Sequence, residues 1–160
     1  MDQSADVGFC YADEEPWGKF SNLYLRSIVF EGREFPASEH AYQAGKPKRD
    51  SVREWLLAAP KPYLLAIVAH ALPRWDVVSN WAEIREERML NVLRAKFSQH
   101  EDLRELLLST GSARLVETPR VNNAQNRRWG EVNGKGGNLL GKLLMQVRAE
   151  LRPASYTQRV

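Results

Sequence analysis

The stretch Phe35-Pro36-Ala37-Ser38-Glu39-His40-Ala41-Tyr42-Gln43-Ala44 marks the point where this sequence changes from short strands and loops to helices. Before it, the pattern over 27–35 predicts a tight antiparallel hairpin, with Glu31-Gly32 as its turn, because glycine tolerates the positive φ of such turns. Within it, Ser38 is a favourable N-cap for a helix from about Glu39 to Lys46. The stretch therefore predicts a strand that leads directly into a helix.

Helical patterns then dominate the chain. The capping-box spacing at Ser51 predicts a helix that ends at Pro60. Further helices are predicted between Pro62 and Pro73, between Asn80 and about Gln99, and over Glu101–Ser109. Short strands are predicted at 8–11 and 113–117, and a long loop over 118–137. The last helix is expected after Asn138, with an apolar stripe at helical spacing made of Leu140, Leu143, Leu144, Val147 and Leu151.

The length of 160 residues fits one compact domain. We therefore expect a single α+β domain over 1–160 that is predominantly helical and has a small antiparallel hairpin near the N-terminus. Its core is expected over about 9–151, and residues 153–160 are expected to form a frayed tail.

Composition narrows the class of protein. The apolar share of 43% and the charged share of 27% are ordinary for a soluble globular chain, and no apolar run is long enough to cross a bilayer. The first residues lack the layout of a signal peptide, and the one cysteine, Cys10, excludes an internal disulfide, so we expect a cytoplasmic protein. The net charge of +3 is compatible with a phosphorylated substrate, although ordinary surface lysines and arginines explain it equally well.

The helix predicted after Ser38 carries an unusual polar face. Helical spacing places Glu39, Tyr42, Gln43 and Lys46 on one side, where a core-facing stripe would be apolar. This set of an acid, a phenol, an amide and an ammonium group suits a binding or catalytic site. The alternative is a solvated face, with Glu39 in the first turn interacting with the helix dipole.

The long helix after Asn80 presents a second candidate face. Trp81, Arg85 and Arg88 lie on one side, so an indole would stand beside two guanidinium groups. Tryptophan can stack on a base, and arginine can bind a phosphate with two hydrogen bonds. The alternative is a half-buried tryptophan covered by the arginine stems.

The third candidate is the segment 126–138, Asn-Arg-Arg-Trp-Gly-Glu-Val-Asn-Gly-Lys-Gly-Gly-Asn, which leads into the last helix. Backbone N–H groups at such a junction suit an anion, although the segment matches neither a P-loop nor a dinucleotide fingerprint. A functionless surface loop is the alternative. Metal catalysis is not expected, because His40, His70 and His100 are far apart and lack ligand spacing with Cys10.

These segments, in this order, resemble the YbiA-like N-glycosidases, also called the NADAR superfamily. The resemblance covers roughly Phe9 to Leu151. The matching pieces are Gly18-Lys19-Phe20-Ser21-Asn22, the stretch 35–44, Asn80-Trp81 with Met89, Leu93-Arg94-Ala95-Lys96-Phe97, Leu106-Leu107-Leu108-Ser109-Thr110, Leu115-Val116-Glu117, Trp129-Gly130, and Asn138-Leu139-Leu140-Gly141 with Leu144-Met145 and Arg148.

The resemblance implies a hydrolase that cleaves the C1′–N bond of a ribosylated base, with no metal or redox cofactor. Family substrates are ribosylamino-pyrimidine phosphates of riboflavin biosynthesis and guanine modified with ADP-ribose, so the expected partners are such small molecules or ADP-ribosylated nucleic acid. The catalytic acid of the family maps to Glu39 and its functional tryptophan to Trp81. The other expected substrate contacts are Phe20, Ser21, Asn22, Tyr42, Gln43, Lys46, Arg85, Trp129, Gly130, Lys135, Gly136 and Asn138.

One position departs from the family pattern. Many relatives carry an aspartate three residues before the Trp-Gly pair as a second catalytic carboxylate, whereas Asn126 stands there in this chain. Asparagine can orient water but cannot accept a proton at neutral pH. Either Glu131 substitutes for the missing acid, or Glu39 acts alone, or the activity is reduced or redirected.

Two non-hydrolase interpretations stay open from the sequence. The chain could be a non-catalytic domain that binds ADP-ribose or a related nucleotide, if Asn126 has removed essential chemistry. It could also be a structural helical module, although its polar helix faces and the segment rich in Gly, Asn and Arg weigh against this.

Overall fold

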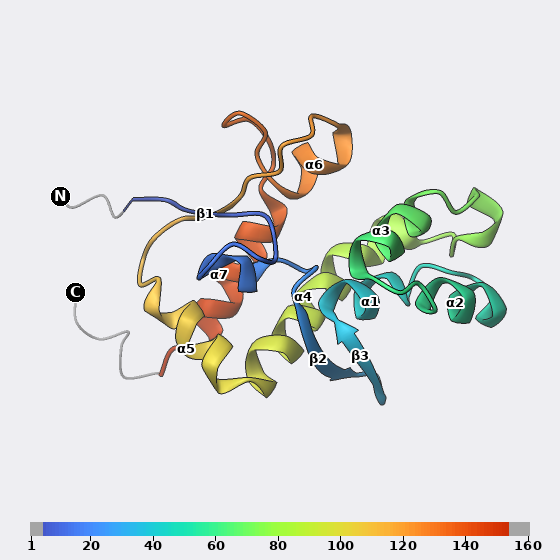
Figure 1. Ribbon diagram of the computed structural model, residues 1–160, viewed down its shortest axis with the longest axis horizontal. Coiled ribbons are helices and arrows are strands. Elements are labelled where there is room, and N and C mark those ends of the chain that lie inside the picture. Colours follow the sequence, from blue (N-terminus) through green and yellow to red (C-terminus); the bar gives the residue numbers. More distant parts are fainter. Residues whose placement is uncertain (1–4, 154–160) are drawn as a thin grey trace. The chain divides into compact units, whose positions relative to one another are not determined.

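The structure is a computed structural model that describes residues 5–153. Its chain divides into two compact units, one comprising Asn22–Lys96 and the other combining the N-terminal residues through Ser21 with the segment from Phe97 onward. The tail predicted at 153–160 lies outside the described residues except for Pro153. The predicted fold class is confirmed, because helices and two small sheets make up a mixed α/β chain (Figure 1).

The unit Asn22–Lys96 begins with the predicted hairpin. Strands β2 (Leu25–Phe30) and β3 (Arg33–Ala37) pair in antiparallel fashion, with a register irregularity between Leu25 and Ile28. The turn residues Glu31 and Gly32 have φ values of 50° and 75°. Positive φ at both central positions matches the twist of the strands, so the turn closes tightly.

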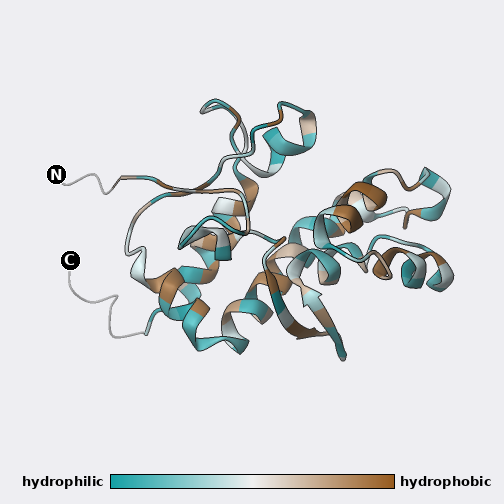
Figure 2. Ribbon diagram, viewed as in Figure 1, coloured by the Kyte–Doolittle hydropathy of each residue, from teal (hydrophilic) through white to brown (hydrophobic). Residues whose placement is uncertain are grey.

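Three helices follow the hairpin. Helix α1 (Ser38–Gln43) packs against both strands and against α3 (Pro62–His70), and α3 also packs against α2 (Asp50–Leu57). Pro62 begins α3 as predicted, since its missing N–H is not needed in a first turn. Figure 2 shows that α3 is largely hydrophobic, whereas α2 is mostly hydrophilic. Leu56 of α2 and Leu65 and Ala69 of α3 form a fully buried cluster between them.

The short 3-10 helix η2 (Arg74–Asp76) leads to the long helix α4 (Trp81–Gln99), whose predicted bounds are confirmed. Met89, Val92 and Leu93 of α4 are buried. The boundary between the two units falls within α4, after Lys96.

The other unit is built on a parallel strand pair. Strand β1 (Val7–Phe9) pairs with β4 (Leu115–Glu117), and α7 (Leu139–Leu151) packs on β4 and on α5 (Glu101–Ser109). Four members of the predicted stripe of α7, Leu140, Leu143, Leu144 and Val147, are buried, and the fifth, Leu151, is half-buried. The 3-10 helix η1 (Trp17–Phe20) packs against β1.

The long loop predicted over 118–137 is wrong in its middle. Residues Ala124–Trp129 form helix α6, because the side chain of Asn123 accepts a 2.8 Å hydrogen bond from the N–H of Asn126. An asparagine at this position satisfies one of the free N–H groups of a first turn. The segment was predicted to be a loop because its composition is polar.

Two predicted caps are also wrong. Ser38 is the first residue of α1 rather than its cap, which is the extended Ala37, and α1 ends at Gln43 instead of reaching Lys46. Helix α2 likewise begins at Asp50, with Arg49 as the preceding extended residue instead of Ser51. At the start of α1, a hydrogen bond from the N–H of Glu39 to the carbonyl of Asn22 takes the place of a local cap.

No helix within residues 5–153 combines the length and the hydropathy needed to span a bilayer.

A substitution at Gly141 would test how closely α7 approaches β4. A Cβ at this position would overlap the backbone carbonyl oxygen of Leu115, which cannot move without disturbing the strand pair. We expect Gly141→Ala to lower the free energy of unfolding by about 2–3 kcal/mol in urea denaturation. Gly8→Ala is the matched control in β1, because its Cβ would meet Thr118 at an ordinary 3.6 Å. Equal stability of the two variants would contradict this packing.

Candidate active site

Helix α1 is buried around its whole circumference. All six residues from Ser38 to Gln43 are buried, and Glu39 is only 8% exposed. The solvated-face interpretation of this helix is therefore wrong. Ionisable side chains are rarely buried without a partner, so the burial of Glu39 calls for a chemical explanation.

The carboxylate of Glu39 is held by its neighbour one turn along the helix. The Nε2 of Gln43 donates a 2.8 Å hydrogen bond to Oε1 of Glu39, and the backbone N–H of Glu39 donates a 3.0 Å bond to the carbonyl of Asn22. Burial raises the pKa of Glu39, against opposing contributions from the Gln43 bond and from Lys46. A carboxyl group in this setting is more basic than an exposed glutamate.

One cation, Lys46, interacts with this acid, and a second cation, Arg85, interacts with Lys46. Lys46 follows α1, and its Nζ donates to the carbonyl of Ala69 in α3. Burial lowers the pKa of Lys46, and the positive charge of Arg85 lowers it further, whereas Glu39 raises it. Glu39 and Lys46 are thus coupled electrostatically, and Lys46 is coupled in turn to Arg85 of α4.

Aromatic and amide groups complete this region. The rings of Tyr42 and Trp81 lie 5.2 Å apart at a tilt of 49°, and both residues are buried. Asn22 is also buried, and its Nδ2 lies 3.3 Å from the sulfur of Met89. The structure therefore brings Asn22, Tyr42, Gln43 and Trp81 into the unit that carries Glu39.

Several buried polar atoms in the same unit have no hydrogen-bond partner. They are Oδ1 of Asn22, Oγ of Ser38, Nδ1 of His40, Oε1 of Gln43 and Nε of Arg85. A buried polar atom left unpaired typically costs about 1–3 kcal/mol, so ordered water or ligand atoms are expected to complete these hydrogen bonds. Sequence reasoning missed Ser38 and His40 as site residues, although both lie in the stretch that it singled out.

Arginine side chains hold the C-terminal end of α1. The guanidinium of Arg88 donates to the carbonyls of Ala41 and Tyr42 at 2.6–3.2 Å, and it also forms an ion pair with Glu31. Arg88 was predicted to share a ligand-binding face with Trp81 and Arg85. Its hydrogen bonds instead assign it to the support of α1, because they add to the backbone bonds at the end of this short helix, where the carbonyl of Tyr42 also accepts from the N–H of Gly45.

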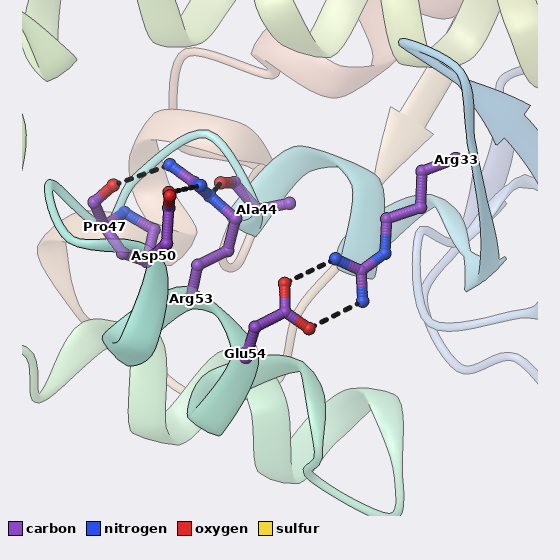
Figure 3. Close-up of polar contacts among 6 residues, drawn as sticks. All are labelled: Arg33, Ala44, Pro47, Asp50, Arg53 and Glu54. Atoms are coloured by element: carbon purple, nitrogen blue, oxygen red, sulfur yellow. Dashed lines mark hydrogen bonds and ion pairs between the residues drawn. The ribbon is translucent and has the colours of Figure 1, made fainter.

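Arg53 supports the residues that follow α1. Its Nε donates a 2.7 Å bond to the carbonyl of Ala44, and it also contacts Pro47 and Asp50 (Figure 3). Figure 3 further shows the paired hydrogen bonds between Arg33 of β3 and Glu54 of α2. These contacts tie the hairpin, α1 and α2 together.

The candidate catalytic residues of the segment 126–138, Asn126 and Glu131, lie in the other unit. Glu131 forms an ion pair with Arg114, which also pairs with Asp6 at 3.0 Å. The Nδ2 of Asn126 donates a 2.8 Å bond to the carbonyl of Val121. Both side chains therefore have structural partners within this unit.

Asn138 and two glycines shape the same segment. Buried Asn138 donates to the carbonyl of Leu115 and accepts from the N–H of Glu117, so its side chain joins the start of α7 to β4. A Cβ at Gly130 or Gly136 would overlap backbone oxygens. Lys135 is exposed, and it forms a β-bridge with Val132.

The remaining predicted contacts, Phe20, Ser21 and Trp129, are buried in this unit. The ring of Phe20 is fully buried against Phe9, Trp17 and Phe97, which is the packing of a core residue and gives no support to a stacking role. Burial raises the pKa of Cys10 to about 11, so its thiol stays protonated near neutral pH and is a poor nucleophile.

Comparison with known proteins places these features in context. The family model of the NADAR domain matches residues 8–152, which include parts of both units. The N-glycosidase YbiA of Shigella flexneri is 38% identical over 142 residues, covering 88% of this chain and 86% of that protein. A riboflavin biosynthesis protein of Vibrio vulnificus is 34% identical over 145 residues, covering 90% of this chain and 38% of that protein.

A solved structure is also similar. The NMR structure of the E. coli protein YbiA matches with a TM-score of 0.81 and 34% identity, covering all of this chain and 92% of that chain.

Arg88 provides a test of how α1 is supported. We expect Arg88→Met to lower the free energy of unfolding by about 2–3 kcal/mol, because hydrogen bonds from a charged group to the α1 carbonyls are lost. Urea denaturation would measure the change. Arg74→Met is the matched control in the same unit, since the side chain of Arg74 is exposed, and we expect a change below about 0.5 kcal/mol. Similar losses in both variants would argue against the proposed support.

Proposed function

The chain belongs to the NADAR domain family, and from this premise we propose that it is an N-glycosidase that hydrolyses the C1′–N bond of a ribosylated base. The observation that carries the proposal is the buried carboxylate of Glu39, held by Gln43 within a group of unpaired polar atoms. A site with these groups offers an acid or base, hydrogen-bond partners and positive charge to a single small molecule.

We assign the catalytic carboxylate to Glu39. Departure of the base leaves positive charge on the sugar, as in glycoside hydrolysis, and a fixed carboxylate stabilises that charge. The same carboxylate can accept a proton from the water that attacks C1′. The raised pKa of Glu39 suits this second role, because a more basic carboxylate is a better proton acceptor.

The base and its ribose are assigned to the amide and aromatic groups near Glu39. The unpaired Oδ1 of Asn22 and Oε1 of Gln43 would accept hydrogen bonds from N–H or O–H groups of the substrate. Trp81, packed on Tyr42, would provide an edge or face for the base. Buried acceptors of this kind reject a ligand that lacks the matching donors.

Lys46 and Arg85 are the proposed phosphate contacts in this unit. Both are cations that interact electrostatically with each other, and an anionic ligand would reduce their mutual repulsion. In the other unit, Lys135 and the backbone around Gly136 stay predicted phosphate contacts, and Trp129, Gly130, Ser21 and Asn138 stay predicted site residues.

We propose further that Glu39 acts without a second carboxylate. Asn126 cannot accept a proton at neutral pH, and Glu131 is engaged by Arg114. Among the two substrate classes, a ribosylamino-pyrimidine phosphate is favoured, because riboflavin biosynthesis proteins are among the relatives of this chain. ADP-ribosylated guanine, free or in nucleic acid, is the second candidate, since Arg120, Arg127 and Arg128 lie in or beside α6.

Mass spectrometry of the reaction products would discriminate between these substrates. The protein is incubated with each ribosylated base in turn, and release of the free base with a ribose-containing product is followed. Faster turnover of the ribosylamino-pyrimidine phosphate is expected. Binding of ADP-ribose by calorimetry, without cleavage of either substrate, would instead support a non-catalytic binding domain and contradict the proposal.

Glu39→Gln tests the assigned catalyst. The amide retains an oxygen that can accept from Gln43 but cannot accept a proton, so kcat/KM is expected to fall about 10²–10⁴-fold. Removing a buried charge should leave Tm unchanged or raise it by about 2–4 °C, which separates lost chemistry from lost folding. Steady-state kinetics and calorimetric scans would measure both quantities.

Glu87→Gln is the matched control for this prediction, because Glu87 is an exposed glutamate on α4. It should change neither kcat/KM nor Tm. Unchanged turnover in Glu39→Gln would rule out Glu39 as the catalytic group.

A further inference from the structure

An apolar groove lies on the surface of the unit Asn22–Lys96. It has a volume of about 480 Å³ and is lined mainly by Val52 and Trp55 of α2, Ile67 and Val68 of α3, and Leu72 and Pro73 beyond α3. We call this surface the α2–α3 groove. None of these six residues has a role in the proposed hydrolysis, so the groove needs a separate explanation.

Large apolar side chains surround the groove and are exposed to solvent. Trp55 is 63% exposed and Ile67 61%, and Trp75, between the lining residues Pro73 and Asp76, is 77% exposed. Tyr63 lies one turn before Ile67 on α3 and is 48% exposed. Exposed apolar side chains gathered at one place are typical of binding surfaces, and tryptophan is strongly enriched at the energetic centres of protein interfaces.

Positive charge is concentrated in the same part of the chain. Within residues 46–76, Asp50 and Asp76 form ion pairs with Arg53 and Arg49, and Glu54 pairs with Arg33 of β3, so each acid of this segment is already engaged by an arginine. Lys48, Lys61 and Arg74 of this segment are exposed. A partner of this surface is thus expected to carry negative charge beside its apolar groups.

From these observations we propose that the α2–α3 groove docks an acidic amphipathic segment of a partner protein. Apolar side chains on one face of a helix would fill the groove, and acidic residues on its flanks would meet Lys48, Lys61 and Arg74. A single-stranded nucleic acid fits less well, because the aliphatic lining would leave the polar edges of its bases without hydrogen-bond partners. This proposal is independent of the chemistry assigned to Glu39.

Selection from a phage-displayed library of helical peptides tests the groove against the full-length protein. The selected peptides should carry apolar residues at i, i+3 or i+4, and i+7, flanked by aspartate and glutamate. Their affinity, measured by calorimetry, should fall as the salt concentration rises. Selection of basic peptides, or of sequences without this pattern, would overturn the proposal.

Substitutions locate the binding surface. Trp75→Ala and Trp55→Ala should each weaken a selected peptide at least about tenfold, because a tryptophan anchor commonly contributes 2 kcal/mol or more. Leu25→Ala is the matched control, since Leu25 is 64% exposed on β2, outside the groove. Arg74→Glu should also weaken binding, whereas the exposed Lys142→Glu in the other unit should not. All five side chains are exposed, so folding should be retained.

Three other occupants are distinguished by the same variants. Oligo(dT), vesicles of phosphatidylglycerol and a second copy of the chain are each tested by calorimetry or by sedimentation. Binding of any of these that exceeds peptide binding and is lost in Trp75→Ala would assign the groove to that occupant and contradict the proposal. Equal peptide binding by wild type and Trp75→Ala would contradict it as well.

Discussion

The hydrogen bonds from Arg88 to the carbonyls of Ala41 and Tyr42 are the contacts on which the candidate site depends. Helix α1 has only six residues, and a helix this short is not stable by itself. Arg88, together with Arg53 at Ala44, satisfies carbonyls at and just beyond its C-terminal end. Tertiary contacts therefore stabilise this short helix and hold the turn that carries Glu39 in place.

Gly45 allows this arrangement. A Cβ at position 45 would overlap the guanidinium group of Arg88, so a glycine is needed where the arginine approaches the backbone. The guanidinium also lies 5.1 Å from the ring of Phe30, which adds a cation–π contact from the hairpin. Strand β2, helix α4 and the end of α1 thus meet at one side chain.

Burial of α1 then determines the electrostatics of the site. Desolvation raises the pKa of Glu39 and lowers the pKa of Lys46 and of His40. Each of these pKa shifts disfavours the charged form of its group, so an isolated charge is destabilised in this site. Positive charge that develops on a substrate near Glu39 would stabilise the buried carboxylate. Burial of Glu39 therefore lowers the stability of the fold and at the same time supports the proposed catalysis.

Local signals predicted much of the fold. Glu31-Gly32 indicated the hairpin turn, Pro62 indicated the start of α3, and Glu101–Ser109 was predicted with its observed bounds. Each depends on backbone preferences that act within a few residues. The parallel pairing of β1 with β4 was not predicted, since it joins residues more than one hundred positions apart.

The candidate site was only partly accessible to the same reasoning. The pattern of α1 showed a polar face that fitted either a site or a solvated surface, and polar residues are usually exposed, so the burial of the helix could not be predicted. Its burial follows from contacts with β2, β3 and α3, which no local pattern encodes. The roles of Arg88 and of the unpaired Ser38 and His40 were missed for this reason, whereas the helix at 124–129 was missed although Asn123 is a recognisable cap.

The pKa of Glu39 in the folded protein tests the central claim most directly. NMR titration of protein labelled with ¹³C at glutamate carboxyl carbons, with Glu39 assigned by its absence in Glu39→Gln, would measure it. The expected pKa lies above the ordinary value of 4.5, since burial disfavours the carboxylate. Between pH 4.5 and the higher pKa of the folded state, the folded protein holds a proton that the unfolded chain has released. The free energy of unfolding therefore declines as the pH rises through this range. A pKa at or below 4.5 would contradict the claim that a buried, basic carboxylate lies at the centre of this site.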